Sequence, residues 1–441
     1  MKRTLIASLA IALAASASAA PGAPPAVAEL PSPLDLKGAI GYALDHNYAI
    51  QQSRETIRLQ EGVIVQVRGR QIPNVSAQGQ WQRNDAAISE LYPPSTSLWS
   101  VELMATQTLY AGGGVVSSIK NAKLARDAAA YDLQTTIDTA LLDVRTKFYN
   151  VLLAREKIRV EEENVKLYEH QLDDTKNQFA TGSVSNFEVL RAKVFLANAQ
   201  PTLITARNSY RIAIEQLRQS LGTPIATAFP EVEGDLNFEP ATYDSDAAIA
   251  AAHEHRPELM RLGKLQDAAG QSVKTAKAGF YPSVQAFGAY EWESFTFANS
   301  SFGTDNASGW LFGLQSTWSI FDGRATDGKV RQAKSQLEQA RLSAASEELE
   351  IDVEVRQAIS SLQEASELVT ASKQTIDQAA EALRLADAKF HAGSATQLDV
   401  LTSQVSLSQA KTDQLTANYN YLVALANVRK AVGLSDALVV P

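Results

Sequence analysis

A long internal repeat constrains the fold of this chain more than any other feature of its sequence. Residues 109–113 (Leu-Tyr-Ala-Gly-Gly) correspond to residues 320–324 (Ile-Phe-Asp-Gly-Arg), 211 positions later. Further pairs with this spacing are Val144 with Val355, Gly182 with Gly393, and Gly222 with Gly433. The spacing is 209 between Pro73 and Pro282, so the length changes between these points. A unit of this size is no short solenoid repeat. We expect two copies of one long unit, each with two strands followed by very long helices.

A seven-residue spacing of apolar side chains predicts the long helices. The positions in the first copy are Ile137, Val144, Val151, Ile158, Val165, Leu172 and Phe179. Those in the second copy are Val355, Leu362, Val369, Ile376, Leu383 and Phe390. A strict heptad keeps one seam of a helix facing its neighbour over many turns. A helix over 114–181 would be ~100 Å long, so we expect it to pack sideways against other helices.

Each long helix is predicted to turn back at a glycine, Gly182 in the first copy and Gly393 in the second. Both stand where a left-handed residue commonly ends a helix. Ser185 and Thr396 follow, each with an acidic residue three positions later. This pattern predicts a capping box at the start of each return helix.

The remaining segments complete the predicted organisation. It comprises a signal peptide (1–19), a Pro/Ala-rich extended lead-in (20–35), a first repeat (36–222), a connector (223–243), a second repeat (244–433) and a tail (434–441). Opening helices are expected over 36–70 and 244–277, and return helices over 186–221 and 397–432. Pro201 predicts a kink in the first return helix.

The amino terminus and the composition limit where the chain can act. Lys2 and Arg3 precede a short apolar run and the small residues 17–19, a pattern typical of an export signal. No later segment offers the ~20 apolar residues of a membrane helix. Cysteine is absent, which excludes disulfides, thiolate metal sites and a lipid anchor on cysteine. With 40 Lys and Arg against 49 Asp and Glu, the chain is a poor candidate for binding nucleic acid.

Four segments alternate apolar and polar side chains, as β-strands do. The apolar faces carry Val75, Ala77 and Trp81; Trp99, Val101 and Leu103; Val284, Tyr290 and Trp292; and Trp310, Phe312 and Leu314. Polar loops over 84–97 and 294–308 are expected to join the strands in pairs. All the tryptophans are assigned to these strands and predict a membrane aromatic belt: Trp81, Trp99, Trp292, Trp310 and Trp318. The alternative is a pair of water-soluble hairpins that bury one face on the helices.

Four lipid-facing strands cannot close on themselves. An open sheet edge in hydrocarbon leaves backbone groups unpaired, at a cost of several kcal/mol each. Closed membrane barrels have about eight strands or more, so other copies of the chain must complete the wall. Two copies would supply eight strands and three would supply twelve. The helices are too long to lie within a membrane, and we expect them to form a second cylinder that crosses a periplasm.

These features together resemble the TolC-like outer-membrane factors, also called outer-membrane efflux proteins. The matching segments are 43–47 in the opening helix, Pro73 and Pro282 at the strand starts, 110–113 and 321–323 at the strand ends, 179–182 and 390–393 at the helix turns, and 399–401 beyond the second turn. The resemblance covers nearly the whole mature chain. It implies an α+β membrane protein in which three chains form a 12-stranded transmembrane β-barrel, four strands per chain, continued by a long α-helical coiled-coil barrel.

The resemblance also implies a location and partners. The protein would be a homotrimer in the outer membrane of a Gram-negative bacterium, with its helices in the periplasm. It would dock to a periplasmic adaptor (a membrane fusion protein) and an inner-membrane transporter, and form a passive exit duct for drugs or other small toxic compounds. Neither a cofactor nor enzymatic activity is implied. Two alternatives stay open: the exit duct of a type I protein secretion system, and a periplasmic coiled-coil scaffold without a pore.

The two helical turns are, by this resemblance, candidate docking surfaces for the adaptor. They comprise Thr181, Gly182, Ser183, Val184, Ser185 and Asn186 in the first copy and Ala392, Gly393, Ser394, Ala395, Thr396 and Gln397 in the second. Helix capping alone would also explain the glycines and hydroxyl residues, and both roles can coexist.

Three residues just beyond the turns are candidates for a periplasmic gate: Glu188, Asp399 and Thr402. In a threefold assembly each carboxylate would form a ring of three, which would favour cations and raise the pKa of each member by mutual repulsion. Helix capping and helix-dipole stabilisation are the alternative roles. The family often has further charged or polar gate residues, where this chain has Ala395 and Thr402.

Other polar clusters are expected to be structural. His253 and His255 could suggest a metal site, but no third ligand is visible. Residues 161–163, three glutamates, are expected to lie on a solvated helix face. We find no catalytic acid–base pair, nucleophile motif or phosphate loop.

Overall fold

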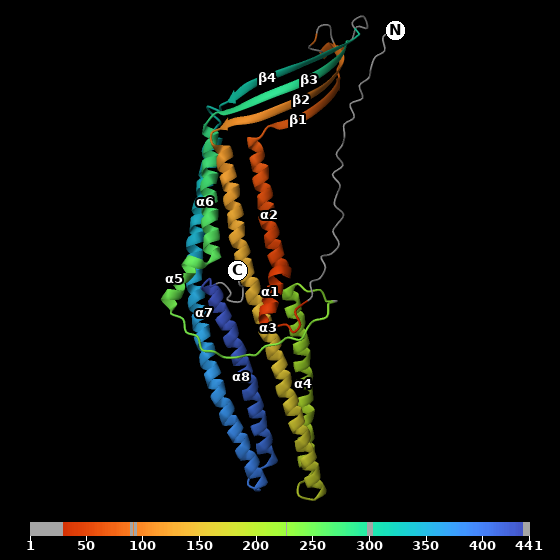
Figure 1. Cartoon of the computed structure of the whole chain (residues 1–441), viewed down its shortest axis with the longest axis vertical. Coiled ribbons are helices and arrows are strands. Elements are labelled where there is room, and N and C mark those ends of the chain that lie inside the picture. The colour runs from red at the N-terminus through yellow and green to blue at the C-terminus, as the bar shows by residue number, and fades with distance from the viewer. Residues whose placement is uncertain (1–29, 89–90, 92–94, 226, 298–302, 435–441) are drawn as a thin grey trace.

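The computed structural model describes residues 30–88, 91, 95–225, 227–297 and 303–434. The predicted signal peptide (1–19), most of the lead-in and most of the tail lie outside these residues. The described chain is elongated, with a β-sheet at one end and two helical turns at the other (Figure 1). We call these the sheet end and the tip end. Within the described part of the chain, no helix is both long and apolar enough to cross a membrane.

The helices confirm the internal repeat. The first set is α1 (Leu36–His46), α2 (Tyr48–Arg68), α3 (Gly114–Ala180) and α4 (Asn186–Leu221). The second set is α5 (Ser245–His255), α6 (Pro257–Lys277), α7 (Ala325–His391) and α8 (Gln397–Ala431). Short 3-10 helices are η1 (Gly69–Gln71), η2 (Ala86–Ile88) and η3 (Ala278–Phe280). The helices before the turns have 11, 21 and 67 residues in both sets, and the return helices have 36 and 35.

The prediction of one opening helix over 36–70 is wrong, because the helix breaks at Asn47. The side-chain oxygen of Asn47 accepts hydrogen bonds from the backbone N–H groups of Ala49 (2.9 Å) and Ile50 (3.3 Å), which caps α2. The second copy breaks at Arg256, and Pro257 opens α6, a position where a missing N–H leaves no helical bond unmade.

The four strands form one antiparallel sheet in the order β1-β2-β3-β4. They are β1 (Asn74–Arg83), β2 (Ser95–Ala111), β3 (Ser283–Phe297) and β4 (Thr304–Thr317). The strands extend into the segments predicted as loops, so the loops are shorter than 84–97 and 294–308. Trp318 lies one residue beyond β4, which corrects its assignment to a strand. Its indole Nε1 donates a hydrogen bond to the Phe280 carbonyl (3.2 Å), where the sheet meets the helices.

The core follows the contacts between long helices. α3 packs against α4 and α7 against α8, and α8 also runs along α3. The predicted heptad seams are buried at Val144, Val151 and Leu172 in α3 and at Val355, Leu362 and Val369 in α7. The two largest clusters surround Phe148 and Tyr421, midway along the molecule. Pro201 lies inside α4 without ending it.

The connector between the repeats is held against the helices at their middle, crossing from α4 toward α5 (Figure 1). The Arg155 guanidinium donates to the carbonyls of Val232 and Gly234, both at 2.8 Å. The Tyr421 hydroxyl donates to the Glu239 carbonyl (2.6 Å). Val232 also pairs in parallel with Leu34, and both side chains are buried. The connector thus joins the repeats as a packed strap.

Candidate channel wall, helical tips and central joint

The strand register sorts the side chains of the sheet into two chemically different faces. Trp81 lies opposite Trp99, and Trp292 lies opposite Val101. Tyr290 lies opposite both Leu103 and Trp310. Because neighbouring residues across strands share a face, the predicted apolar faces form one continuous aromatic surface. Its large side chains are exposed in the single chain.

The other face carries the acidic side chains of the sheet, together with apolar ones such as Leu98, Phe287 and Leu311. Glu102 lies opposite both Gln78 and Glu291, and Glu293 and Asp305 fall on the same face by the strand alternation. Within the strands, Arg83 is the one basic residue, and it belongs to the aromatic face. A sheet with an apolar aromatic face and a charged face suits a wall between lipid and water.

The sheet has two unpaired edges. Among the described residues, β1 pairs only with β2 and β4 pairs only with β3, so each strand has one side of its backbone without a strand partner there. In hydrocarbon such edges cost several kcal/mol per unpaired group. The sheet is therefore a section of a wall that needs a partner strand at both ends.

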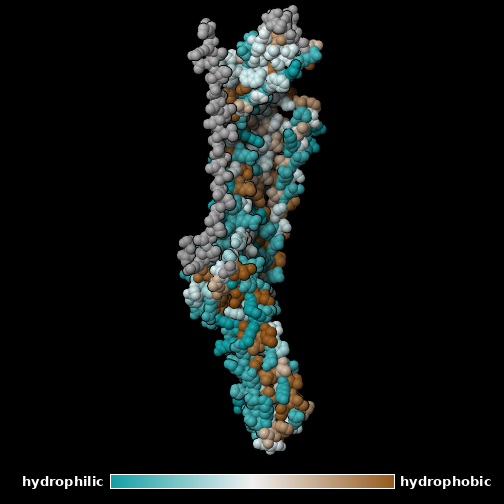
Figure 2. Space-filling view, turned by 90° about the vertical axis from the view of Figure 1, so that its right-hand side faces the viewer, coloured by the Kyte–Doolittle hydropathy of each residue, from teal (hydrophilic) through white to brown (hydrophobic). Residues whose placement is uncertain are grey.

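The helices show the same incompleteness when the two repeats are compared. Leu401 of α8 packs against Tyr168 of α3 and is 2 % exposed. Its counterpart in the first repeat, Leu190 of α4, is 51 % exposed. In the same way Ala268 of α6 is 5 % exposed, and its counterpart Leu59 of α2 is 61 % exposed. Figure 2, viewed from the side that carries α4, shows apolar patches along the helices toward the tip end.

Both helical tips have the predicted left-handed glycine. The φ angle is 75° at Gly182 and 73° at Gly393. At the second tip the predicted capping box is present, with Thr396 and Asp399 bonding each other's backbone N–H groups (2.7 and 3.3 Å). At the first tip it is absent, since the Ser185 side chain makes no capping bond.

The structure gives the three gate candidates different environments. Glu188 is half-buried and forms an ion pair with Arg191 at 2.9 Å, so its charge is partly neutralised within its own helix. Asp399 is exposed, and hydrogen bonds from the Thr396 hydroxyl and backbone hold its pKa below the usual value. Thr402 is exposed. Asp399 therefore has no cationic side chain paired with it in its own helix, whereas Glu188 is paired with Arg191.

Gln397 differs from the other residues of the predicted docking tips because it is buried, at 5 % exposure. Its amide Nε2 donates to the Thr175 hydroxyl on α3 at 2.5 Å. The other tip residues are exposed or half-exposed.

Comparison with known proteins identifies the family. A family model described as "Outer membrane efflux protein" matches residues 39–223 and 248–434, one segment in each repeat. The chain belongs to this family. Membership places the protein in the outer membrane, as predicted from the sequence.

Individual relatives agree with this assignment. Outer membrane protein TolC of Escherichia coli is 27 % identical over 319 residues, which cover 68 % of this chain and 62 % of TolC. The alkaline protease secretion protein AprF of Pseudomonas aeruginosa is 25 % identical over 303 residues, covering 67 % of this chain and 62 % of AprF. The matches thus span less than two thirds of either relative. A crystal structure of CusC matches with a TM-score of 0.77 at 18 % identity, over 90 % of this chain and 92 % of that one, which confirms the fold.

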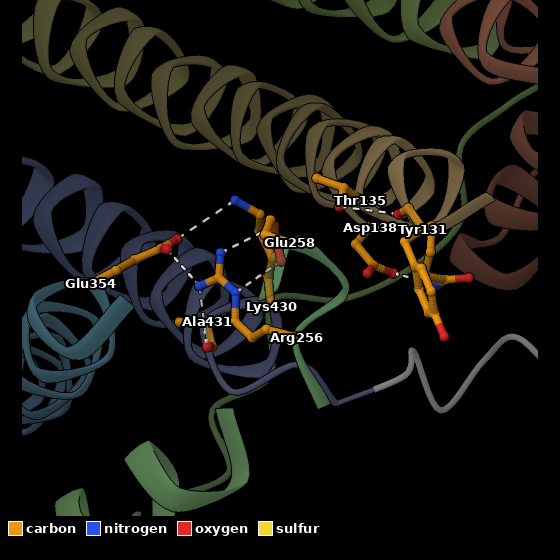
Figure 3. A network of polar contacts seen from close by, with 9 residues as sticks. Tyr131, Thr135, Asp138, Arg256, Glu258, Glu354, Lys430 and Ala431 are labelled. Atoms are coloured by element: carbon orange, nitrogen blue, oxygen red, sulfur yellow. Dashed lines mark hydrogen bonds and ion pairs between the residues drawn. The ribbon is translucent and has the colours of Figure 1, made fainter. Parts of the chain in front are cut away.

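The efflux-family chain also contains a buried ionic joint that its sequence did not reveal (Figure 3). Arg256, between α5 and α6, is 4 % exposed. It donates to Glu258 (3.1 Å), to Glu354 of α7 (2.5 Å) and to the Ala431 carbonyl at the end of α8 (3.3 Å). Lys430 approaches Glu354 at 3.6 Å. In the sequence, Glu258 two residues after Arg256 is the available signal for an ion pair.

Burial and charge act in opposite directions in this joint. Burial alone would raise the pKa of Glu258, but hydrogen bonds from Arg256 and from its own backbone hold that pKa below the usual value. Burial raises the pKa of nearby Asp138 on α3, although Gln134 donates a hydrogen bond to it at 3.0 Å. The joint therefore carries one carboxylate that is stabilised in its charged form and one that is not.

The remaining polar clusters make contacts between helices. The His253 ring contacts Asp352 at 2.7 Å, and the described residues contain no group of three metal-ligating side chains. The glutamates at 161–163 lie on an exposed or half-exposed helix face, as expected, and two of them also form ion pairs. Glu162 pairs with Arg207 of α4 (2.8 Å) and Glu163 with Lys411 of α8 (3.0 Å), so they link helices.

Proposed function

We propose that this chain forms the outer-membrane exit duct of a tripartite efflux system, a passive conduit made of three copies that docks to a periplasmic adaptor and an inner-membrane transporter. The observation that carries the proposal is the mismatch between the repeats. Faces that are buried inside the chain in one repeat are exposed at the corresponding positions of the other.

A ring of identical chains explains this difference in exposure between the repeats. If the exposed face of α4 contacts the α7 of a neighbouring copy as α8 contacts α3, Leu190 becomes buried like Leu401. The same arrangement of neighbouring copies places Leu59 of α2 against the neighbour's α7. It also brings the free edge of β1 beside the free edge of β4. Such a head-to-tail contact closes into a cyclic assembly.

Three copies fit a conduit better than two. An eight-stranded barrel has an interior that its own side chains fill, which leaves no passage. Twelve strands form a wider barrel, and three is the smallest number of copies that leaves an aqueous interior. The resemblance to the TolC-like factors implies the same number.

The aromatic face supports a membrane belt. On β3, Ser294 lies opposite Trp99 of β2, and Ser283 lies opposite the last residue of β4. These two positions of β3 are eleven residues apart. That separation is about 36 Å along a strand. It becomes about 28 Å at a tilt of about 40°, close to the ~25 Å apolar band of membrane barrels. Trp318 would mark the periplasmic side of the belt, and Trp81, Trp99, Trp292 and Trp310 the outer part.

The tips are the proposed contacts for the adaptor. Residues 181–186 and 392–396 are exposed or half-exposed at the far end from the sheet, where a periplasmic partner could reach them. Asp399 and Thr402 would lie at the entrance, with Asp399 as the charged ring. Glu188 contributes less, because Arg191 already pairs with it.

Two measurements test the proposal. Purified protein in detergent should have the mass of three chains, and in planar lipid bilayers it should conduct ions. A particle that stays soluble without detergent and conducts nothing would instead support a periplasmic scaffold without a pore.

A second candidate function is the exit duct of a type I secretion system, because AprF is a protease secretion protein. The two functions share one duct. They are separated by expressing the chain in a strain that lacks its own exit channel, then measuring both resistance to small toxic compounds and release of a secreted protease. Restored resistance without secretion supports efflux.

A further inference from the structure

A groove lies beside the connector at the middle of the molecule, and the proposed passage of cargo makes no use of it. Its volume is about 460 Å³. Volumes of roughly 300–1,000 Å³ are typical of binding sites. The floor of the groove is apolar and consists of side chains from α3 and α8: Phe148, Tyr149, Leu152, Tyr421, Leu422 and Leu425. We call this the connector groove.

The rim of the connector groove is acidic. The carboxylates that line it are exposed and belong to Asp35, Glu233, Asp235 and Glu239, and Lys37 is the one basic residue of the lining. Among the described residues, none of these carboxylates has an ion-pair partner. The chain from 219 to 255 contains no lysine or arginine that could supply one. The rim therefore has an excess of negative charge that a basic partner would complement.

The backbone of the connector provides a third element of recognition. Residues 235–239 belong to no helix or strand, and none of their backbone N–H groups has a hydrogen-bond partner within the described part of the chain. Two carbonyls hold this stretch against α8, because Leu236 accepts from Asn418 (3.2 Å) and Glu239 accepts from the Tyr421 hydroxyl (2.6 Å). A stretch that is fixed in place and has free N–H groups can pair with an added extended segment.

The connector crosses the helices on the face that carries the groove (Figure 1). In the proposed duct this is the outer face, because three connectors on the inner face would cross the bore. The groove then opens to the periplasm at mid-height, away from both the sheet end and the tip end. This orientation rests on the proposed function.

We propose that the connector groove is a docking site for an extended segment of a periplasmic protein, in which lysine or arginine alternates with apolar residues. Alternate side chains of an extended segment point to opposite sides, so the apolar ones fill the floor while the basic ones meet the rim. A protein segment fits better than a small organic cation, because Asp235, Asn237 and Glu239 bring free backbone N–H groups to the lining. Each chain of the assembly carries one such site.

The test uses the purified trimer in detergent and a capped five-residue peptide that alternates lysine and leucine, with a fluorophore at one end. Fluorescence anisotropy should show saturable binding of one peptide per chain. Two control peptides have serine in place of leucine or glutamate in place of lysine. Each should bind about tenfold more weakly, because it lacks either the apolar burial or the charge complementarity.

Glu233→Gln combined with Asp235→Asn is the decisive variant. Each exposed carboxylate should contribute roughly a two- to fivefold factor to the affinity for the lysine–leucine peptide. The matched control combines Glu367→Gln with Asp377→Asn, which removes the same charge from exposed positions of α7 outside the groove. This control should leave the affinity unchanged.

A second readout locates the bound peptide. The chain has no native cysteine, so Asn237→Cys introduces a single thiol at an exposed position of the lining. A lysine–leucine peptide with a bromoacetyl end should alkylate this thiol faster than the glutamate–leucine peptide does. Glu233→Gln combined with Asp235→Asn should remove the difference. A thiol introduced by Asp377→Cys should react with both peptides at the same rate.

The outcomes separate the docking site from the channel. If the trimer does not conduct ions but binds the peptide as expected, the channel function fails and the docking site stands. If the trimer conducts and Glu233→Gln with Asp235→Asn binds the peptide like the control variant, the docking site is refuted. Tetraphenylphosphonium that displaces the peptide at an equal concentration would overturn the protein segment in favour of a small organic cation. A peptide that blocks ion conduction would place the groove inside the bore and overturn its outward orientation.

Discussion

The two repeats have the same order of helices and strands but differ in the side chains at their helix breaks. At the helix break of the first repeat, Asn47 donates to the Ser220 carbonyl (2.7 Å). At the break of the second, Arg256 donates to the Ala431 carbonyl (3.3 Å), which is the corresponding position. One joint is neutral and the other is ionic. The duplicated fold thus fixes where a backbone carbonyl needs a donor, and leaves open which side chain supplies it.

The difference extends to the helix surfaces. The second repeat packs α6 and α8 against α3 of the first, whereas the first repeat leaves the matching faces of α2 and α4 open. Two nearly equivalent halves therefore have unequal roles. One repeat completes contacts inside the chain, and the other leaves the matching faces open, where the proposed assembly would place a neighbour.

The largest effect is expected at the open face. Leu190→Asp should leave the chain folded but prevent assembly, because each contact with a neighbour would bury a charge at a cost on the order of several kcal/mol. Particle mass in detergent should fall to that of one chain. Leu190→Met should still assemble. A trimeric Leu190→Asp protein would show that α4 does not face a neighbour.

The next effect is expected at the ionic joint. Arg256→Met should leave Glu258 buried without its partner and lower stability by about 3 kcal/mol, since Glu354 is partly exposed and can be solvated. Asn47→Ala removes both the cap of α2 and the hydrogen bond to the Ser220 carbonyl and should cost about 2 kcal/mol, less than the ionic joint. Thermal unfolding of the two variants in detergent compares the joints directly. Equal losses of stability in the two variants would show that the ionic joint contributes no more to stability than the neutral one.

A smaller effect is expected from pH. The pKa of Glu258 is lower in the folded chain than its usual value of 4.5, so its stabilising contribution is complete above that value. It is lost as pH falls through the lowered folded pKa. Asp138, with a raised pKa, has the opposite sign and gains stability as pH falls. Glu258→Gln should therefore flatten the acid loss of thermal stability below pH 4.5. An unchanged acid profile would show that Glu258 is not responsible.

The smallest effect is expected at the tips. Thr396→Ala removes a complete capping box and should cost about 1 kcal/mol of local stability. Ser185→Ala should change stability by less than about 0.5 kcal/mol, because Ser185 makes no capping bond. Amide hydrogen exchange at the first turns of α8 and α4 measures the two effects separately. Faster exchange in α4 of Ser185→Ala would contradict the observed geometry.

Much of this architecture could be predicted from the sequence, because it depends on periodic patterns. The heptads predicted α3 and α7, and the alternation of polar and apolar residues predicted which side chains share the aromatic face. The left-handed glycines 182 and 393 were also predicted correctly. In each case the signal is local, and the heptads and the strand alternation also repeat many times along the chain.

The parts that could not be predicted depend on contacts between distant segments. Arg256 meets Glu354 and Ala431 only after α7 and α8 have packed, and Glu163 meets Lys411 only across two helices. Ser185 has the spacing of a capping box, but Glu188 turns to Arg191 instead. Trp318 was misplaced because strand ends carry no periodic signal.

The equal lengths of corresponding helices have a consequence for how such a protein can change over time. α3 and α7 have 67 residues each, and their return partners differ by one residue. An insertion in one of them alone would make its tip protrude by about 5 Å per added turn and would disturb the level rim that any docking partner meets. Functional variants of a different length should therefore carry matched insertions in α3, α4, α7 and α8. The length of the helical part can change only if these four helices change together.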